Sequence, residues 1–500
     1  MARRPLHAAI AGAAALALAV VPAGPGLAHD EGVGDVPTNS RGAEVAESGA
    51  GKAMSFVANL QYDGSGEAQN GSDIEFVKVG KKEYALAGTL RGGLQIIDIT
   101  DPQRPVLAAV YDCAISQGDI QVWRHGHRIL ASYTADGTFG EEGAASRCGR
   151  DLELGPDASG TVILDLSTPT QPQTVSYLHV PRGSHNMTVH PSGRYLYNSN
   201  SDLLTSTAPT ITIYDISQPE TPKKVQDYPL PFVPLSLGSE SHDITFNADG
   251  SRAYSAALSQ TLVLDTTDPA APTQVAQILD PAINVAHQAD PVTLTREDGS
   301  EREVLVVTDE RAGAAASAEC PGGGLHLYDV TGAKEQSPEK IGTWFIPAVQ
   351  PQDGATCTSH VLRIYPEQEM LTIAWYSQGV RVLDISGLAD VEGSPAEVGI
   401  GDGVGMTEVG HYVLPDSDTW SFKTNRIAAD GSFYGYGNDL VRGFDVYRFD
   451  GLDRSVPPLE PVDLASRRPA PQGNRLAGLA IVAPALLVAA VARRRTARSR

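Results

Sequence analysis

Short, mostly apolar runs that end in an aspartate recur along the chain. The first is Leu94–Asp98, which is followed by Pro102, and a proline also follows each of the next three copies. A short apolar run bounded by turn residues is typical of a buried strand, and the aspartate and proline favour a turn after it. The copies recur at intervals of 50 to 67 residues, and their aspartates are Asp98, Asp165, Asp215, Asp265, Asp329, Asp384 and Asp445.

Each repeat also contains an earlier pair of strand-like segments. Ser184–Val189 precedes a turn at Pro191–Gly193, and Ser241–Phe246 precedes a turn at Asp249–Gly250. Glycine supplies the positive φ that tight hairpin turns require. We therefore predict four strands per repeat: two joined by the hairpin, the strand that ends in aspartate, and a fourth strand after the proline turn. An all-strand pattern with a period near 50 residues is typical of a β-propeller with one blade per repeat.

The two ends of the repeat array complement each other. Ser55–Leu60 resembles a fourth strand but has no aspartate motif before it, whereas the last motif, at Asp445, has no convincing strand after it. We predict that the N-terminal segment supplies the outer strand of the last blade, because this pairing removes two open sheet edges. The predicted fold class is all-β, a seven-bladed β-propeller closed by an N-terminal strand.

The motif resembles that of the LVIVD-repeat family, whose name describes four apolar residues followed by an aspartate. The resemblance covers residues 54–450 and implies a propeller, but it implies no particular activity. The chain departs from the family pattern at Gln95 and Thr212 within the motif and at Gly443 in the last copy.

The seven aspartates permit two interpretations. They would either form a functional ring of carboxylates or each accept a hydrogen bond from the backbone N–H two residues later and fix the turn. The structural interpretation is favoured because each aspartate ends a strand, and in the first four copies a turn containing proline follows.

The net charge of −22 restricts the possible partners. A negative field disfavours binding to nucleic acid or to anionic membrane surfaces. It is compatible with cations, with basic partners or with solubility alone, and solubility is the favoured explanation. The chain contains no Gly-x-Ser-x-Gly, no phosphate-binding loop and no His-Glu-x-x-His motif, so these enzyme classes have no support.

Both ends of the chain carry targeting patterns. Residues 1–28 combine two arginines, an apolar stretch and a small-residue cleavage site, which predicts a signal peptide. Residues 476–492 are uncharged and an arginine-rich tail, 493–500, follows, which predicts a transmembrane helix with the tail in the cytoplasm and the propeller outside. We expect linkers at 29–53 and 451–475. A retained N-terminal anchor and a cell-wall sorting signal are the alternatives, and the lack of Leu-Pro-x-Thr-Gly disfavours the second.

Export would allow the four cysteines to form disulfides. Three pairings are possible. In a propeller, the connections between blades and the loops between the second and third strands open on the same face, and all four cysteines fall in such segments. This topology favours Cys113–Cys148 and Cys320–Cys357. Because long loops on a rigid scaffold often carry function, we predict this face to be the binding face.

Four of the twelve histidines occupy one position, at the start of the first strand of four consecutive blades. The first strand of each blade lines the central channel, so these imidazoles are expected at the channel mouth. The histidines are His185, His242, His287 and His360; the equivalent residues in the other blades are placed at Ser72, Gly118 and Lys423; and the nearby oxygen candidates are Glu240, Asp309 and Glu310.

Converging imidazoles suit zinc or copper, or iron when a carboxylate joins them. Alternatively, the histidines bond to neighbouring backbone and close the channel. Two functions follow: an exported, membrane-anchored propeller that binds a small ligand or a surface protein through its disulfide-bonded face, or a metal-dependent oxidase or hydrolase. The second is similar in outline to the periplasmic methanethiol oxidase and selenium-binding protein family, although no motif matches closely. A purely structural surface protein is the third possibility.

Overall fold

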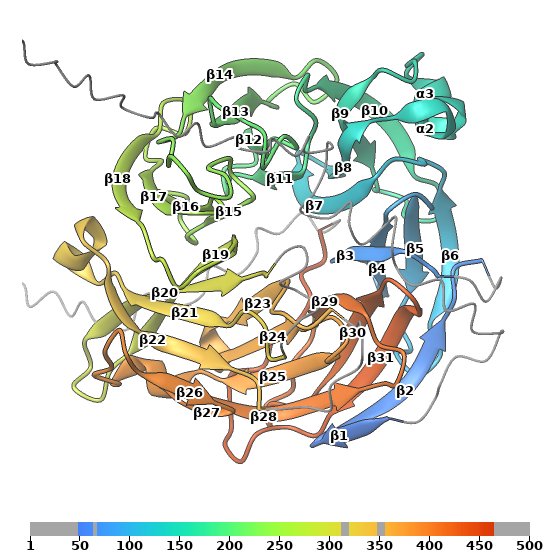
Figure 1. Cartoon of the computed structure of the whole chain (residues 1–500). Helices are drawn as coiled ribbons and strands as arrows, with labels where there is room; N and C mark the ends of the chain where they lie inside the picture. Colours follow the sequence, from blue (N-terminus) through green and yellow to red (C-terminus); the bar gives the residue numbers. More distant parts are fainter. Residues whose placement is uncertain (1–48, 64–67, 312–319, 348–355, 465–500) are drawn as a thin grey trace, which may run out of the picture. The chain divides into compact units, whose positions relative to one another are not determined.

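A computed structural model describes residues 49–63, 68–311, 320–347 and 356–464. Within these residues the chain forms seven four-stranded antiparallel blades, with the first strand of each blade at the centre and the fourth at the outside (Figure 1). The predicted seven-bladed propeller is confirmed. The predicted signal peptide, transmembrane helix and basic tail lie outside the described residues, and no helix within them is long and apolar enough to cross a bilayer.

The blades follow one another in sequence order, and only the last one takes a strand from the other end of the chain. Their strands are β3 (Gly71–Val79), β4 (Lys82–Thr89), β5 (Leu94–Asp98) and β6 (Val106–Tyr111) in blade 1; β7 (Gln117–His125), β8 (Arg128–Thr138), β9 (Ser159–Asp165) and β10 (Gln173–His179) in blade 2; β11 (Asn186–Val189), β12 (Tyr195–Ser199), β13 (Thr210–Asp215) and β14 (Lys223–Pro229) in blade 3; β15 (Asp243–Phe246), β16 (Arg252–Ala256), β17 (Thr261–Asp265) and β18 (Thr273–Ile278) in blade 4; β19 (Ala286–Thr295), β20 (Glu301–Asp309), β21 (Leu325–Asp329) and β22 (Glu339–Phe345) in blade 5; β23 (Leu362–Tyr365), β24 (Met370–Ala374), β25 (Val380–Asp384) and β28 (Met406–Val413) in blade 6; and β29 (Thr419–Lys423), β30 (Phe433–Asp439), β31 (Gly443–Phe449) and β2 (Met54–Leu60) in blade 7.

Strand β2 closes the ring as predicted, because it pairs antiparallel with β31 and becomes the outer strand of blade 7. The structure also shows two features that the motif pattern does not predict. Strand β1 (Ala50–Lys52), within the expected linker, pairs with β28. An insertion in blade 6 forms β26 (Val398–Ile400) and β27 (Asp402–Gly403), and β26 pairs in parallel with β22 of blade 5. These strands join the two blades into one sheet.

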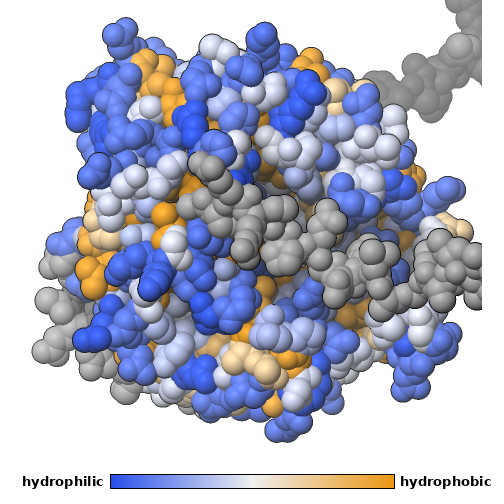
Figure 2. Space-filling view, turned by 180° about the vertical axis from the view of Figure 1, so that it is seen from behind, coloured by the Kyte–Doolittle hydropathy of each residue, from blue (hydrophilic) through white to orange (hydrophobic). Residues whose placement is uncertain are grey.

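The core lies between neighbouring blades. One cluster joins Leu130 and Ile163 of blade 2 to Met187 and Leu196 of blade 3, and all four side chains are buried. Each blade thus covers its neighbour, so no blade buries its apolar face alone. The surface seen in Figure 2 is mostly hydrophilic, with scattered apolar residues, as the large net charge leads one to expect.

The motif aspartates have the structural role that the sequence favours. In the first six blades, the carboxylate accepts a hydrogen bond from the backbone N–H two residues later, at 2.8–3.0 Å. Asp445 of blade 7 differs: it accepts hydrogen bonds from Arg442 Nε at 2.7 Å and from Asn59 Nδ2 at 2.8 Å. The last copy of the motif therefore fastens the N-terminal strand instead of a turn.

This difference predicts that replacing Asp445 with alanine lowers the unfolding free energy more than replacing the aspartate of another blade. Asp445→Ala removes the carboxylate next to the fully buried Arg442, and breaking a buried ion pair costs about 3–5 kcal/mol. Asp265→Ala removes a turn bond at a partly exposed site, which is worth about 1 kcal/mol. Urea unfolding of the two variants measures the difference. Equal losses of unfolding free energy would contradict the closing role of Asp445.

Both predicted disulfides are present, as Cys113–Cys148 and Cys320–Cys357. Cys148 lies on the short helix α3 (Arg147–Asp151), which follows α2 (Gly140–Ala145) in the long loop of blade 2. Three further short 3-10 helices, η2 (Gly332–Gln336), η3 (Pro366–Gln368) and η4 (Ser386–Ala389), lie after β21, β23 and β25. The first bridge joins the connection that enters blade 2 to the long loop of the same blade, and the second joins the long loop of blade 5 to the connection that enters blade 6.

Residues 451–464, expected as part of a linker, contact the propeller. Leu459 pairs with Ile427, and Asp463 pairs with Lys78 next to the first hairpin turn of blade 1. Val456 is 5% exposed and belongs to the core between blades 6 and 7. The last described residues therefore lie beside the hairpin turns, on the face opposite the disulfides.

Candidate metal centre

The four histidines stand at equivalent places at the inner ends of blades 3 to 6. The backbone N–H of His185 donates to Ser199 O, that of His242 to Ala256 O and that of His360 to Ala374 O, at 2.7–3.1 Å. Each is thereby held against the second strand of its own blade. A buried apolar residue of the core follows each histidine two positions later: Met187, Ile244, Ala289 and Leu362.

The imidazoles form a row and do not meet at a single point. Ring centroids are 4.3 Å apart from His185 to His242, 4.2 Å from His242 to His287 and 4.3 Å from His287 to His360. All four are at most 2% exposed. The Nε2 atoms of His185 and His242 are 3.1 Å apart, within hydrogen-bonding distance.

A carboxylate lies at each end of the row. Asp136 Oδ1 is 3.4 Å from His185 Nδ1. At the other end, Glu310 Oε2 is 3.8 Å from His287 Nε2, and Glu310 Oε1 is 3.6 Å from His360 Nε2. One ligand atom from each of His242, His287 and Glu310 lies within 4.8 Å of the other two, which makes this trio the candidate metal site.

The hydrogen bonds of His360 and Glu310 define their chemical states. His360 Nδ1 is 2.7 Å from the carbonyl oxygen of Trp420, and because a carbonyl only accepts, Nδ1 carries the hydrogen and Nε2 faces Glu310 as a lone pair. Burial lowers the pKa of His360 to about 3, so the ring is neutral near pH 7. Burial also raises the pKa of Glu310 to about 8, and Tyr376 donates its hydroxyl hydrogen to Glu310 Oε1 at 2.7 Å.

The structure places the other two oxygen candidates away from this trio. Glu240 accepts hydrogen bonds from Arg182 Nη2 at 2.5 Å and from Asn200 Nδ2 at 2.9 Å. Asp309 accepts backbone hydrogen bonds from residues 284 and 285 at 2.8 and 3.0 Å, and its second oxygen is 3.8 Å from His326 Nε2. Of the three candidates, Glu310 alone joins the histidines.

One equivalence assigned from the sequence is wrong. Trp420 occupies the histidine position in blade 7: it precedes the buried Phe422 by two residues, and its ring centroid is 4.6 Å from that of His360. Lys423 stands three residues further along the strand. Counting back from the turn at Asp430–Gly431 fails because the hairpin loop of this blade is longer. The spacing to Phe422 is the signal that would have placed Trp420.

Ser72 and Gly118 stand at the histidine position in blades 1 and 2, two residues before the buried Ile74 and Ile120. The hydroxyl of Ser72 is 3.5 Å from the carbonyl oxygen of Gly118. A side chain at Gly118 would lie 2.9 Å from both Thr89 O and the Tyr133 hydroxyl, so this position has no room for an imidazole. The row therefore ends at blade 3 for a steric reason.

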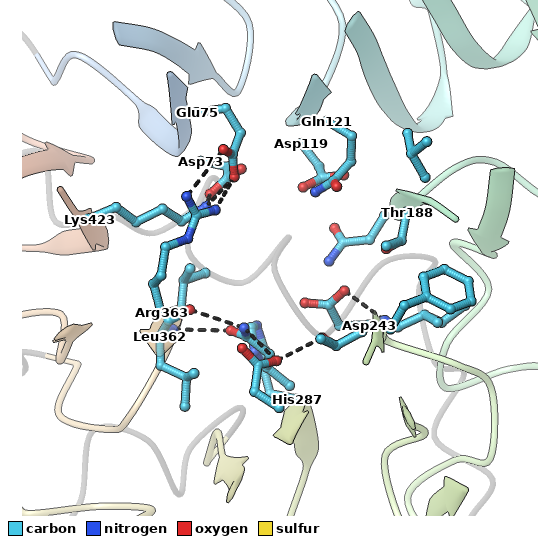
Figure 3. Close-up of a pocket in the computed structure, with 18 of the residues that line it drawn as sticks. Asp73, Glu75, Asp119, Gln121, Thr188, Asp243, His287, Leu362, Arg363 and Lys423 are labelled. Atoms are coloured by element: carbon cyan, nitrogen blue, oxygen red, sulfur yellow. Dashed lines mark hydrogen bonds and ion pairs between the residues drawn. The ribbon is translucent and has the colours of Figure 1, made fainter. Parts of the chain in front are cut away.

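A polar cavity of about 380 Å³ lies beside the row, and His242, His287 and Trp420 contribute to its wall. Its other lining residues come from the inner strands of the blades, and Figure 3 shows their side chains around a common space. Lys423 is part of this wall: its Nζ binds Asp73 Oδ1 at 2.6 Å and Glu75 Oε1 at 3.1 Å. The two histidines of the candidate metal site thus border a space that a small molecule can fill.

Comparisons with known proteins extend no further than the fold. No protein-family model matches the chain, and no curated sequence does. Solved structures that resemble it include the periplasmic gluconolactonase PpgL of Pseudomonas aeruginosa, with 10% identity and a TM-score of 0.48 over 75% of this chain and 98% of the other. The β-propeller domain of Cps50 (Swd1) from Myceliophteria thermophila has 11% identity and a TM-score of 0.46, over 78% and 99%. A protein from Lactobacillus plantarum has 10% identity and a TM-score of 0.46, over 77% and 96%.

Proposed function

We propose that this protein is an exported propeller that binds a transition metal at His242, His287 and Glu310 and uses it toward a small ligand in the adjoining cavity. The observation that carries the proposal is the buried trio itself, with two imidazoles and one carboxylate whose ligand atoms lie within 4.8 Å of one another. Zinc, copper and iron all accept this set of ligands. When bound, such an ion would supply Lewis-acid chemistry and, for copper or iron, redox chemistry.

The distances fit a compact metal site. Ligand atoms about 2.0–2.1 Å from a tetrahedral zinc ion lie about 3.3 Å from one another. The 3.8 Å between His287 Nε2 and Glu310 Oε2 therefore needs only a small contraction. His360 borders the site with a lone pair on Nε2, and its Nδ1–H donates to a carbonyl, which is the outer contact usual for histidines that bind metal.

The Cys320–Cys357 disulfide lies next to the segments that carry Glu310 and His360. Cys320 lies in the loop that begins at Glu310, and Cys357 lies three residues before His360. The Ser359 hydroxyl donates to Asp309 O at 2.8 Å, and the backbone N–H of Arg311 donates to the Thr358 hydroxyl at 2.9 Å. The bridge therefore holds together the two segments that carry Glu310 and His360. These contacts favour a ligand site at this face over a separate binding surface.

We further propose that the chain is anchored in the cell membrane through residues 476–492 and belongs to the LVIVD-repeat family, on the strength of the motif alone. The two disulfides support an extracellular propeller.

Elemental analysis of the purified full chain tests the metal site. After expression with zinc, copper and iron supplied, we expect about one equivalent of one of these metals per chain. His287→Ala removes a ligand and is expected to lower the metal content at least tenfold. His190→Ala, which changes a buried histidine in a hairpin of blade 3, should keep it.

Two outcomes would overturn the proposal. A wild-type chain without stoichiometric metal means that the imidazole row is structural and closes the centre of the ring. Equal metal content in the wild type and in His287→Ala places the metal elsewhere. Circular dichroism of each variant, compared with the wild type, shows whether a loss of metal follows from a loss of fold.

A further inference from the structure

The central cavity has a charge pattern that the metal site does not explain. Its ionisable lining, apart from the histidines, consists of five carboxylates and two cations. The cations are Lys423 and Arg363, and both lie on the side where blades 6, 7 and 1 meet (Figure 3). The carboxylates are Asp73, Glu75, Asp119, Asp243 and Asp290.

Two of the carboxylates already neutralise the two cations. Lys423 Nζ binds Asp73 Oδ1 at 2.6 Å, and Arg363 forms a two-nitrogen contact with Glu75, with Nη1 3.3 Å from Oε2. This side of the cavity is therefore balanced in charge. A ligand carboxylate or phosphate would have to displace one of these buried pairs, which disfavours anionic ligands.

The other three carboxylates are held by neutral donors. Asp119 Oδ2 accepts from the backbone N–H of Met187 at 3.1 Å. Asp243 Oδ1 accepts from the N–H of the next residue at 2.7 Å. Asp290 Oδ1 accepts from the Thr245 hydroxyl at 2.7 Å. Within the described part of the chain, none of the three forms an ion pair with a lysine or arginine.

Asp119 gives the strongest evidence for a bound cation, because its side chain is only 9% exposed and yet lines the cavity. Only one of its two carboxylate oxygens has a hydrogen-bond partner among the described residues. Gly118, just before it, has φ +66°, a conformation that glycine adopts without strain and that fixes the entry to the strand. A buried carboxylate without a counter-charge is costly, and a bound cation would offset this cost.

We propose that the cavity binds a small organic cation with two or more ammonium groups, an aliphatic diamine or polyamine, which meets Asp119, Asp243 and Asp290. Asp243 and Asp290 come from the neighbouring blades 4 and 5, and Asp119 comes from blade 2. The negative charge is therefore spread over two parts of the cavity wall and suits separated charges better than one point charge. Apolar side chains also line the cavity, among them Val122, Val189 and Ile364, and they suit the methylene segments of such a ligand. The proposal goes beyond the metal site, because none of the three aspartates belongs to the trio.

Calorimetric titration of the full chain with putrescine and spermidine tests this site. Binding is expected for both and is expected to persist after the metal is removed with a chelator. Asp119→Asn keeps the shape and one hydrogen bond but removes the charge, and it should weaken binding at least tenfold, as loss of one partner of a buried charge pair does. Its metal content should stay unchanged. The exposed turn residue Asp268 supplies the control variant Asp268→Asn, which should bind as the wild type does.

Three outcomes would overturn the amine site. The first is no detectable binding of either amine to the wild type. The second is equal affinity of the wild type and Asp119→Asn, which would place the amine at the acidic outer surface. The third is binding of calcium or magnesium ions without binding of amines. Metal content measured on the same samples separates these failures from a failure of the proposed metal centre.

Discussion

A chain that begins at Gln61 is expected not to fold cooperatively, whereas a chain that begins at Met54 folds. The first truncation removes β2 and leaves blade 7 with three strands and an open edge. It also uncovers apolar side chains on both faces of blade 7. Met54 packs in the core between blades 6 and 7, and Leu60 packs against the core between blades 7 and 1.

The expected loss of unfolding free energy is large enough to unfold a typical domain. Each buried apolar side chain contributes about 1.5–3 kcal/mol, and β2 carries the buried Met54 together with several partly buried apolar side chains. Loss of Asn59 also removes a hydrogen-bond donor from Asp445. The total is comparable to the whole stability of a domain, about 5–15 kcal/mol. Thermal unfolding followed by circular dichroism compares the two truncated chains. A cooperative transition near that of the longer chain would contradict the closing role of β2.

The repeat motif made the fold predictable because one local pattern carries the architecture. A mostly apolar run and an aspartate mark the third strand of every blade, and the spacing of the copies gives the number of blades. The ring closure could be predicted because the strand at Ser55–Leu60 and the motif at Asp445 each lacked a partner. The insertion in blade 6, with β26 and β27, could not be predicted because its short strands pair with a neighbouring blade and carry no repeat pattern of their own.

The site was predictable to the extent that it follows the repeat. The four histidines share one register position, so their proximity could be inferred from spacing, whereas their arrangement in a row could not. The choice among Glu240, Asp309 and Glu310 could not, because it depends on which groups each carboxylate faces in space. Arg182 holds Glu240, from a segment nearly sixty residues earlier. The register of Trp420 was missed because a longer hairpin loop shifted the count.

The cavity was not foreseen. The residues that line it follow the histidine position on the inner strands, but they differ from blade to blade, from Asp119 to Gln288 to Val361. A repeat pattern identifies residues that the blades have in common. The cavity wall consists of residues that differ between blades, so the pattern does not predict it. Its charge balance becomes visible only when the ion pairs of Lys423 and Arg363 are known.

Glu310→Gln is expected to stabilise the metal-free protein at pH 8 while it removes metal binding. Burial raises the pKa of Glu310 to about 8 in the folded chain, against about 4.3 in an unfolded one. Between these values the folded state binds more protons than the unfolded state, so this group lowers stability as pH rises from about 4 to about 8. Glutamine is neutral throughout and can still accept the hydrogen bond from Tyr376.

The difference between the two proteins should therefore depend on pH. It is expected to be about 1 kcal/mol at pH 5 and about 4–5 kcal/mol in favour of the variant at pH 8, since each pKa unit corresponds to about 1.4 kcal/mol. His360, with a pKa of about 3, lowers stability as pH falls below about 6.5. Because it does so in the wild type and in the variant, its contribution cancels from the difference between them. Urea unfolding with a chelator at both pH values measures the effect, and the exposed Glu141 supplies the control Glu141→Gln.

The direction of this change separates a binding site from a structural one. A carboxylate kept for stability would make the glutamine variant weaker at every pH. A carboxylate kept for a cation costs stability when the cation is absent, and its removal is then favourable. If Glu310→Gln is less stable than the wild type at pH 8 in the presence of a chelator, the charge of Glu310 is compensated within the protein itself and a metal is not needed to explain it.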